Sequence, residues 1–356
     1  MSLRADPPAR PPLVVDEITS DIPGRAAMTD SNLVNPWGIT YKPPAPGSLG
    51  GPFWVSDNGT GKATVYDGVG TAVRRPITIP TPSGGTSPST PTGVVFNPSE
   101  TDFLLNGPGT AARFIFVTED GTISGWNSGN NAVLKVDNSK SGAVYKGAAL
   151  ASDGGANFLY VTNFHDNRVE VYDSSFHLVN SFSDRRIPRQ FAPFGITNIG
   201  GVLFVTYAKQ ERPEKKDDQA GPGNGFVDAF DPSGRLLLRV ASRGTLNSPW
   251  GLTVGPSSFG RFASDLLVGN FGDGRISAFR AVLARGRIVR FRFDGRLSDS
   301  SSGKLIKING LRGLIPGNNG QGGVLTSLYF NAGIDGGKHG LLGALFPCDP
   351  ARCPRS

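Results

Sequence analysis

A short turn that ends in glycine and leads into an apolar run recurs along this 356-residue chain. Its glycines stand at positions 38, 93, 147, 195, 251 and 313, so successive copies are 55, 54, 48, 56 and 62 residues apart. The clearest copies read Pro36-Trp37-Gly38 and Pro249-Trp250-Gly251, and the most divergent is Arg312-Gly313. A sustained period is the signature of repeat architectures. The sequence therefore predicts six structural units.

Each unit contains further short apolar runs bounded by Gly, Asp and Asn. In the first unit, Phe53–Val55 runs into a polar turn and Thr64–Tyr66 follows it. Runs of this length and composition are typical of β-strands, and no amphipathic helix is evident. Three or four strands in each of six units predict an all-β fold, a six-bladed β-propeller.

The two ends of the repeat predict how the ring closes. The sixth unit is one strand short, whereas an extra strand-like run, Leu13–Ile18, precedes the first unit. Pairing that run with the last blade would remove an exposed sheet edge. We therefore predict one propeller domain over residues 13–347, with flexible tails at 1–12 and 348–356.

The net charge of +7 is concentrated in one segment. From Arg280 to Arg312 there are nine basic residues and two acidic ones, Asp294 and Asp299. Nine minus two gives +7, so this segment accounts for the whole net charge of the chain. A nucleic-acid-binding protein would show a basic face interleaved with aromatic residues. The pattern therefore makes nucleic acid an unlikely partner.

Targeting signals and cysteines add little. No apolar run is long enough to span a bilayer, and the charged, proline-rich start lacks the apolar core of a signal peptide. We expect either a cytoplasmic protein or one whose leader has been removed. Cys348 and Cys353 are too few for a zinc site, and they form either a small disulfide loop or two free thiols.

Several segments together resemble a known family. They include Asn32–Ile39, Thr118–Trp126, Phe191–Ile196 and Leu267–Gly274. They resemble the bacterial family of conserved hypothetical NHL-like propellers associated with PEP-CTERM exported proteins, from about Leu13 to Leu345. The resemblance implies a six-bladed propeller in a secreted, periplasmic or extracellular setting, and it implies no catalytic residues. Two positions depart from the family pattern, since Met28 replaces a histidine and Arg312 a tryptophan.

The polar turns that end the second strand of each unit supply the first candidate site. If these strands lie near the channel, their last residues meet at one mouth. Carboxylate and amide oxygens are ligands that Ca²⁺ prefers, so these residues predict a calcium site, whereas the alternative is that Asp and Asn simply suit turns. The proposed ligands are Asp57, Glu119, Asn163 and Asn270, with Tyr207 beside them as a ligand-binding residue.

Three further features are candidates. His165, flanked by carboxyl and amide groups, is a candidate general base, because histidine is suited to proton transfer near neutral pH. Asp217 and Asp218 lie in a charged insertion that is either a lid over a ligand or a solvated loop. Arg290 and Arg292 share one face of a predicted edge strand, where they either prevent edge pairing or contact an acidic polysaccharide.

These observations favour an exported monomer that binds a small molecule, polysaccharide or protein at the channel mouth. The alternative is a calcium-dependent hydrolase or lactonase-like enzyme at the same mouth. No Gly-x-Ser-x-Gly elbow, P-loop or paired histidine ligands support other enzyme classes.

Overall fold

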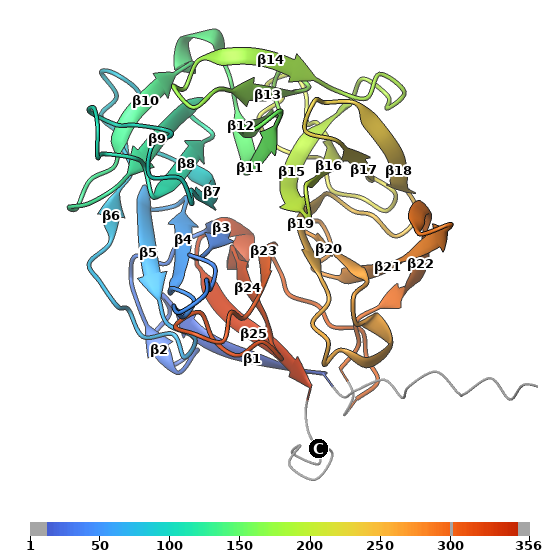
Figure 1. Ribbon diagram of the computed structural model, residues 1–356. Coiled ribbons are helices and arrows are strands. Elements are labelled where there is room, and N and C mark those ends of the chain that lie inside the picture. The colour runs from blue at the N-terminus through green and yellow to red at the C-terminus, as the bar shows by residue number, and fades with distance from the viewer. Residues whose placement is uncertain (1–12, 300–301, 348–356) are drawn as a thin grey trace, which may run out of the picture.

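The computed structural model describes residues 13–299 and 302–347, and these residues form six β-sheets arranged as blades around a central channel (Figure 1). The predicted tails and both cysteines lie outside the described residues. The all-β six-bladed propeller is therefore confirmed.

Blades one to three follow one another along the chain, and each has four antiparallel strands, the first of which lines the channel. Blade one contains β3 (Pro36–Thr40), β4 (Phe53–Asp57), β5 (Lys62–Tyr66) and β6 (Ile77–Thr78). Blade two contains β7 (Pro91–Phe96), β8 (Phe114–Thr118), β9 (Thr122–Trp126) and β10 (Val133–Asp137). Blade three contains β11 (Tyr145–Asp153), β12 (Ala156–Asn163), β13 (Arg168–Tyr172) and β14 (Leu178–Phe182).

Blades four and five repeat this plan with longer strands. Blade four contains β15 (Phe191–Ile199), β16 (Val202–Lys209), β17 (Gly225–Phe230) and β18 (Leu236–Ser242). Blade five contains β19 (Pro249–Val254), β20 (Leu266–Asn270), β21 (Ile276–Ala284) and β22 (Arg287–Arg296).

Blade six joins the two ends of the chain. It combines β23 (Leu311–Pro316), β24 (Leu328–Ala332) and β25 (Leu341–Pro347) with β1 (Leu13–Ser20) and the short β2 (Met28–Thr29). Strand β1 runs antiparallel to β25, from the Leu13–Pro347 pair to the Ser20–Leu341 pair. The predicted closure by an N-terminal strand is confirmed.

Helix is confined to single turns in the described residues. These are η1 (Ser139–Ser141), η2 (Gly260–Phe262) and α1 (Ile334–Gly337). None of the described helices has the length and apolar character needed to cross a membrane.

The hydrophobic core lies between neighbouring blades. One cluster, for example, joins Tyr160 and Val171 of blade three to Leu203 and Val205 of blade four. Each blade therefore buries its faces against its two neighbours.

The repeat glycines mark the level at which the six inner strands approach most closely. A Cβ atom on Gly195 would lie 2.1 Å from the carbonyl oxygen of Trp250, and one on Gly251 would lie 2.3 Å from that of Arg312. A Cβ on Gly38 would meet a neighbouring blade's backbone in the same way, at 2.5 Å. No side chain fits at these contacts. We call this level the glycine waist, and it divides the channel into two ends.

Candidate functional site

The residue that precedes the repeat glycine points into the channel in five of the six blades. These five residues form what we call the channel plug: Trp37, Lys146, Phe194, Trp250 and Arg312. The ring of Trp37 meets those of Phe194 and Trp250 edge to face, at centroid distances of 6.0 and 5.9 Å. The Trp250 indole N–H donates a hydrogen bond across the channel to the carbonyl oxygen of Lys146, at 3.0 Å. The plug thus ties together blades that are not neighbours.

Two of the plug residues are cations, and both are buried. The exposed fraction is 1% for the Lys146 side chain and 5% for Arg312. Lys146 Nζ lies 4.9 Å from the centre of the Trp37 ring. The Arg312 guanidinium carbon lies between two rings, 3.9 Å from the centre of Trp37 and 3.4 Å from that of Phe271. Aromatic faces attract cations in this arrangement.

A buried carboxylate balances the lysine. Glu119, which follows β8, forms a short ion pair with Lys146 and accepts a hydrogen bond of 3.0 Å from the Asn58 amide. Burial alone would raise the pKa of Glu119, but the charge and hydrogen bond of Lys146 outweigh it and hold the pKa below its usual value. Glu119 is therefore ionised at neutral pH and is not suited to act as a general acid.

We call the end of the channel that holds Lys146, Glu119 and Arg312 the polar end. A long loop of blade four, residues 210–224 between β16 and β17, lies next to it. Gln210 anchors its start, because the side-chain amide donates to the carbonyl oxygen of Phe164 at 2.6 Å. Asp217 lies 3.7 Å from Lys146. Burial raises the pKa of Asp218 above its usual value, although the Ser248 hydroxyl and the charges of Arg312 and Lys146 act in the opposite direction. We call these residues the blade-four loop.

The other end of the channel is open and has a different chemistry. A cavity of about 520 Å³ lies there, lined by the inner strands of all six blades. Its lining includes no Asp, Glu, Lys, Arg or His, and it is formed mainly by the residues that follow each repeat glycine. We call this end the apolar end.

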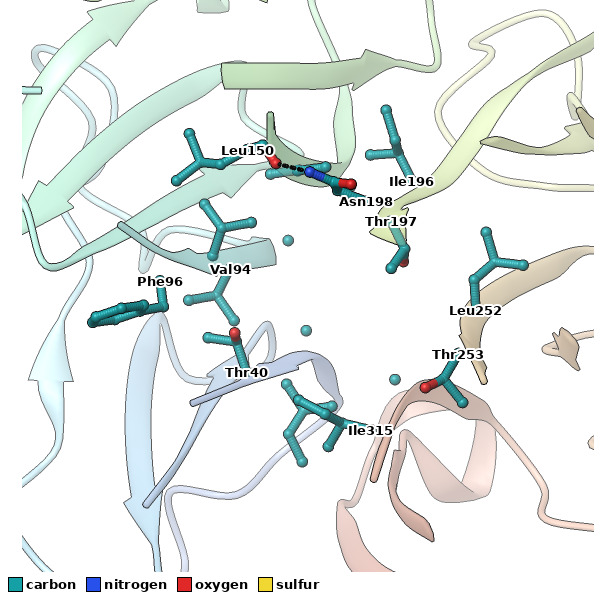
Figure 2. Close-up of a pocket in the computed structure, with 18 of the residues that line it drawn as sticks. Thr40, Val94, Phe96, Leu150, Ile196, Thr197, Asn198, Leu252, Thr253 and Ile315 are labelled. Carbon is teal, nitrogen blue, oxygen red and sulfur yellow. Dashed lines mark hydrogen bonds between the residues drawn. The ribbon is translucent and has the colours of Figure 1, made fainter. Parts of the chain in front are cut away.

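Figure 2 shows how the apolar cavity is built. Val94, Leu252 and Ile315 surround it together with a few hydroxyl groups, such as those of Thr40 and Thr253. At the rim, the Asn198 amide donates a hydrogen bond of 2.7 Å to the carbonyl oxygen of Leu150, which links blades three and four. An apolar wall with a few placed polar groups is typical of small-molecule sites.

Comparison with known proteins shows relatives whose function is not described. The uncharacterized protein R648 of Acanthamoeba polyphaga mimivirus is 30% identical over 343 residues, which are 93% of this chain and 79% of the viral protein. The chain belongs to the family of R648. No family model matches the chain. R648 and the uncharacterized protein L690, a second relative from the same virus, do not support the bacterial PEP-CTERM-associated family suggested by the sequence.

Solved structures share the fold of this R648 relative at low identity. The apo-form of a soluble aldose sugar dehydrogenase from Escherichia coli aligns with a TM-score of 0.55 at 11% identity, covering 94% of this chain and 100% of the enzyme. A virginiamycin B lyase from Staphylococcus aureus aligns with a TM-score of 0.51 at 14% identity, covering 94% and 99% of the two chains. At these identities the likeness concerns the fold alone.

Three of the predicted calcium ligands make hydrogen bonds within their own blades. Asp57 accepts hydrogen bonds from the backbone and side chain of Thr64, in its own blade. Asn163 donates to Glu170 at 2.9 Å, and Asn270 donates to the carbonyl oxygen of Arg275 at 3.1 Å. Across residues 13–299 and 302–347, no group of three or more His, Cys, Asp and Glu side chains could hold a metal ion.

Strand register explains why Glu119 alone reaches the channel plug. Asp57, Asn163 and Asn270 each pair with the residue that lies two positions before a repeat glycine. In blade two the equivalent position is Thr118, so Glu119 stands one residue further along the turn. The predicted residues are expected to be equivalent positions of the six turns, but Glu119 of blade two lies one residue later in its turn than Asp57, Asn163 and Asn270 do in theirs.

The remaining candidates lie in three different environments. His165 hydrogen-bonds through Nδ1 to the adjacent Asp166 at 2.9 Å and is partly exposed. Tyr207 is fully buried in the core between blades three and four. Arg290 and Arg292 are exposed on β22, the outermost strand of blade five. Of the predicted residues, Glu119, Asp217 and Asp218 interact with the cations of the channel plug.

The sequence analysis did not single out the channel plug. The signal was present in the repeat itself, because the position before the glycine is aromatic in three units and cationic in two. A position that alternates between aromatic rings and cations at the same level of a ring is suited to cation–π packing. The departure at Arg312, noted from the family resemblance, is one of these two cations.

Proposed function

We propose that this protein is a binding protein whose apolar end accepts a small, uncharged and largely apolar molecule. The observation that supports this best is the cavity of about 520 Å³ with no charged residue in its lining. Its volume falls within the usual range for small-molecule sites. A charged ligand there would lose its hydration without gaining a partner.

The channel plug, which adjoins the cavity, supports the same proposal. Trp250 belongs both to the plug and to the cavity lining, so this residue forms part of the floor. The hydrogen bond from Trp250 to Lys146 and the packing of Trp37 hold that floor in place. Because a preformed site is already ordered, ligand binding costs it little conformational entropy.

An exported setting is a further part of the proposal, and only the sequence resemblance supports it. Fractionation of cells that express the full-length gene tests it directly. Recovery of the protein in the periplasm or the medium supports export, and recovery in the cytosol alone contradicts it.

The binding proposal is tested with N-phenyl-1-naphthylamine, a neutral apolar dye that fluoresces when it leaves water. We expect saturable binding of one dye per chain, with an affinity that changes little between low and high salt because no charge is involved. The substitution Thr197→Trp adds a large ring at a position that lines the cavity and should abolish binding.

A matched control is Thr86→Trp, the same change at an exposed loop position that is not part of the cavity lining. It should bind the dye as the wild type does. Equal binding by the Thr197→Trp variant would contradict the proposed site, and so would a strong dependence on salt.

A further inference from the structure

Arg312, at the polar end of the channel, has hydrogen-bond donors that no neighbour uses. Its Nε and Nη1 atoms are buried, and neither has a hydrogen-bond partner among the described residues. The Trp37 indole N–H, which lies in the same plug, is also buried without a partner. A buried guanidinium without partners is costly, because its N–H groups have lost water and gained nothing. These donors are therefore available to an acceptor that the described residues do not supply.

The nearest acids lie close by but do not satisfy these donors. The Oδ2 atom of Asp218 is buried and makes no well-formed hydrogen bond among the described residues, although the Ser248 hydroxyl is near enough to lower the pKa of Asp218 and the carboxylate is near enough for its charge to act on Arg312. Asp217 lies 3.7 Å from Lys146 and its side chain is 65% exposed. The blade-four loop therefore brings negative charge to the two cations without short, well-directed bonds to Arg312.

The loop is held at its two ends and also folds back on itself, because Gln210 and Asp218 form an isolated β-bridge and the Glu211 N–H donates to the Asp217 carbonyl oxygen at 2.8 Å. Gln210 anchors its start to the carbonyl oxygen of Phe164, and the Gly221 N–H donates to the Asn247 side chain near its end, at 2.7 Å. The residues between them, from Glu211 to Asp217, are mostly exposed. Moving the middle of this loop would break few buried contacts, which is typical of segments that open locally.

The charges indicate which ligand the site prefers. Lys146 and Arg312 contribute two positive charges, and Glu119, bonded to Lys146, contributes one negative charge. Without the loop carboxylates these three side chains therefore carry one net positive charge, and Lys216 of the loop is near enough for its charge to act on Glu119 as well. An anion would neutralise this excess. The rings of Trp37 and Phe271 contact the Arg312 guanidinium, whose Nε and Nη1 atoms have no hydrogen-bond partner among the described residues. Carboxylates accept charge-assisted hydrogen bonds from guanidinium N–H groups.

We propose that the polar end of the channel is a binding site for a small carboxylate, held by Arg312 and Lys146 beside Trp37, and that Asp218 of the blade-four loop takes the ligand's place when the site is empty. This site is separate from the one at the apolar end. The two proposals can therefore fail independently.

The test is calorimetric titration with sodium benzoate, with benzamide as the neutral molecule of the same shape. The substitution Asp218→Asn removes the competing carboxylate and keeps the size of the side chain. It should tighten benzoate binding by about tenfold or more, since hydrogen bonds to charged groups are worth this much. Benzamide should bind neither the wild type nor the Asp218→Asn variant measurably.

The matched control is Glu214→Gln, which changes the net charge by the same amount at an exposed position of the same loop. It should bind benzoate as the wild type does. Equal benzoate affinity in the Asp218→Asn and Glu214→Gln variants would overturn the proposal. The Arg312→Gln variant should lose benzoate binding; if it does not fold, the comparison of the two loop variants still decides.

Two further measurements locate the bound anion within the channel. Benzoate should speed tryptic cleavage after Lys215 and Lys216 in the wild type, because the ligand displaces the loop, and unchanged cleavage would contradict displacement. The Thr197→Trp variant, filled at the apolar end, should still bind benzoate. Loss of benzoate binding in that variant would place the anion in the apolar cavity and overturn the assignment.

Discussion

The two ends of the central channel are built from the same six strands but have opposite chemistry. Before each repeat glycine the inward positions supply aromatic rings and two buried cations, and after it they supply apolar and hydroxyl side chains without charge. The boundary is the glycine waist, where neighbouring backbones touch. Stability and binding should therefore respond to charge at one end only.

The largest expected effect follows from breaking the buried ion pair at the polar end. The substitution Lys146→Met leaves the Glu119 carboxylate buried without its partner. It should lower the free energy of unfolding by about 3–5 kcal/mol, as for other broken buried pairs. Urea denaturation measures this, with Thr40→Val at the apolar end as a control that should change stability by about 0.5 kcal/mol or less.

The double variant Glu119→Gln/Lys146→Met sharpens the same test. Because it removes both charges, it should be more stable than the sum of the two single changes implies. Additive losses would show that the two side chains do not stabilise each other.

A somewhat smaller effect is expected at the boundary between the two ends. The substitution Gly195→Ala places a methyl group 2.1 Å from the Trp250 carbonyl oxygen, and neither backbone can yield without moving a blade. It should cost about 3 kcal/mol, at the upper end of ordinary overpacking.

Gly147 provides the matched position, because its Cβ would lie 3.1 Å from the nearest atom, the Phe194 carbonyl oxygen. The Gly147→Ala variant should therefore be clearly more stable than Gly195→Ala in the same urea titration. If the two variants lose equal stability, the glycines are needed for another reason than close approach of the strands.

The sequence predicted the ring better than it predicted the site, for a physical reason. Six glycines at a near-constant spacing follow from the packing at the waist, and the missing strand of blade six follows from ring closure, so both leave a local mark on the sequence. The ion pair of Glu119 and Lys146 joins blades two and three, and the stacking of Arg312 on Phe271 joins blades five and six. Each of these contacts would be lost if the turn that carries it shifted by one residue, and a single sequence does not determine the position of a turn that closely.

A pH titration tests the charge of Glu119 at the polar end, with a smaller expected effect on the free energy of unfolding. Since the pKa of Glu119 is held below its ordinary value of 4.5 in the folded protein, its contribution to stability is fully present above about pH 4.5 and is lost as the pH falls through the lowered value. The difference in unfolding free energy between the wild type and the Glu119→Gln variant should be constant from pH 7 to 5. Below pH 4.5 it should shrink by at most ~1.4 kcal/mol per pH unit, and a difference that does not change with pH would exclude the charge of Glu119 as its source.

The smallest effect on stability is expected where charge is exposed, outside the channel. Strands β21 and β22 are joined by a two-residue turn at Arg285 and Gly286, both with positive φ, and Arg287, Arg290 and Arg292 are exposed on β22. We expect these four arginines to retain the protein on a heparin column at low salt and to release it steeply as salt rises, because exposed charges are screened within ~8 Å at physiological ionic strength. Replacing all four by serine should abolish retention while leaving the melting temperature nearly unchanged.

The buried cations Lys146 and Arg312 should by contrast contribute nothing to retention, so a Lys146→Met variant that stays folded should elute with the wild type. A large drop in melting temperature for the four-serine variant would show that the arginine stems pack against blade four, as Phe291 does against Phe204, and would remove the basis for an acidic polysaccharide partner.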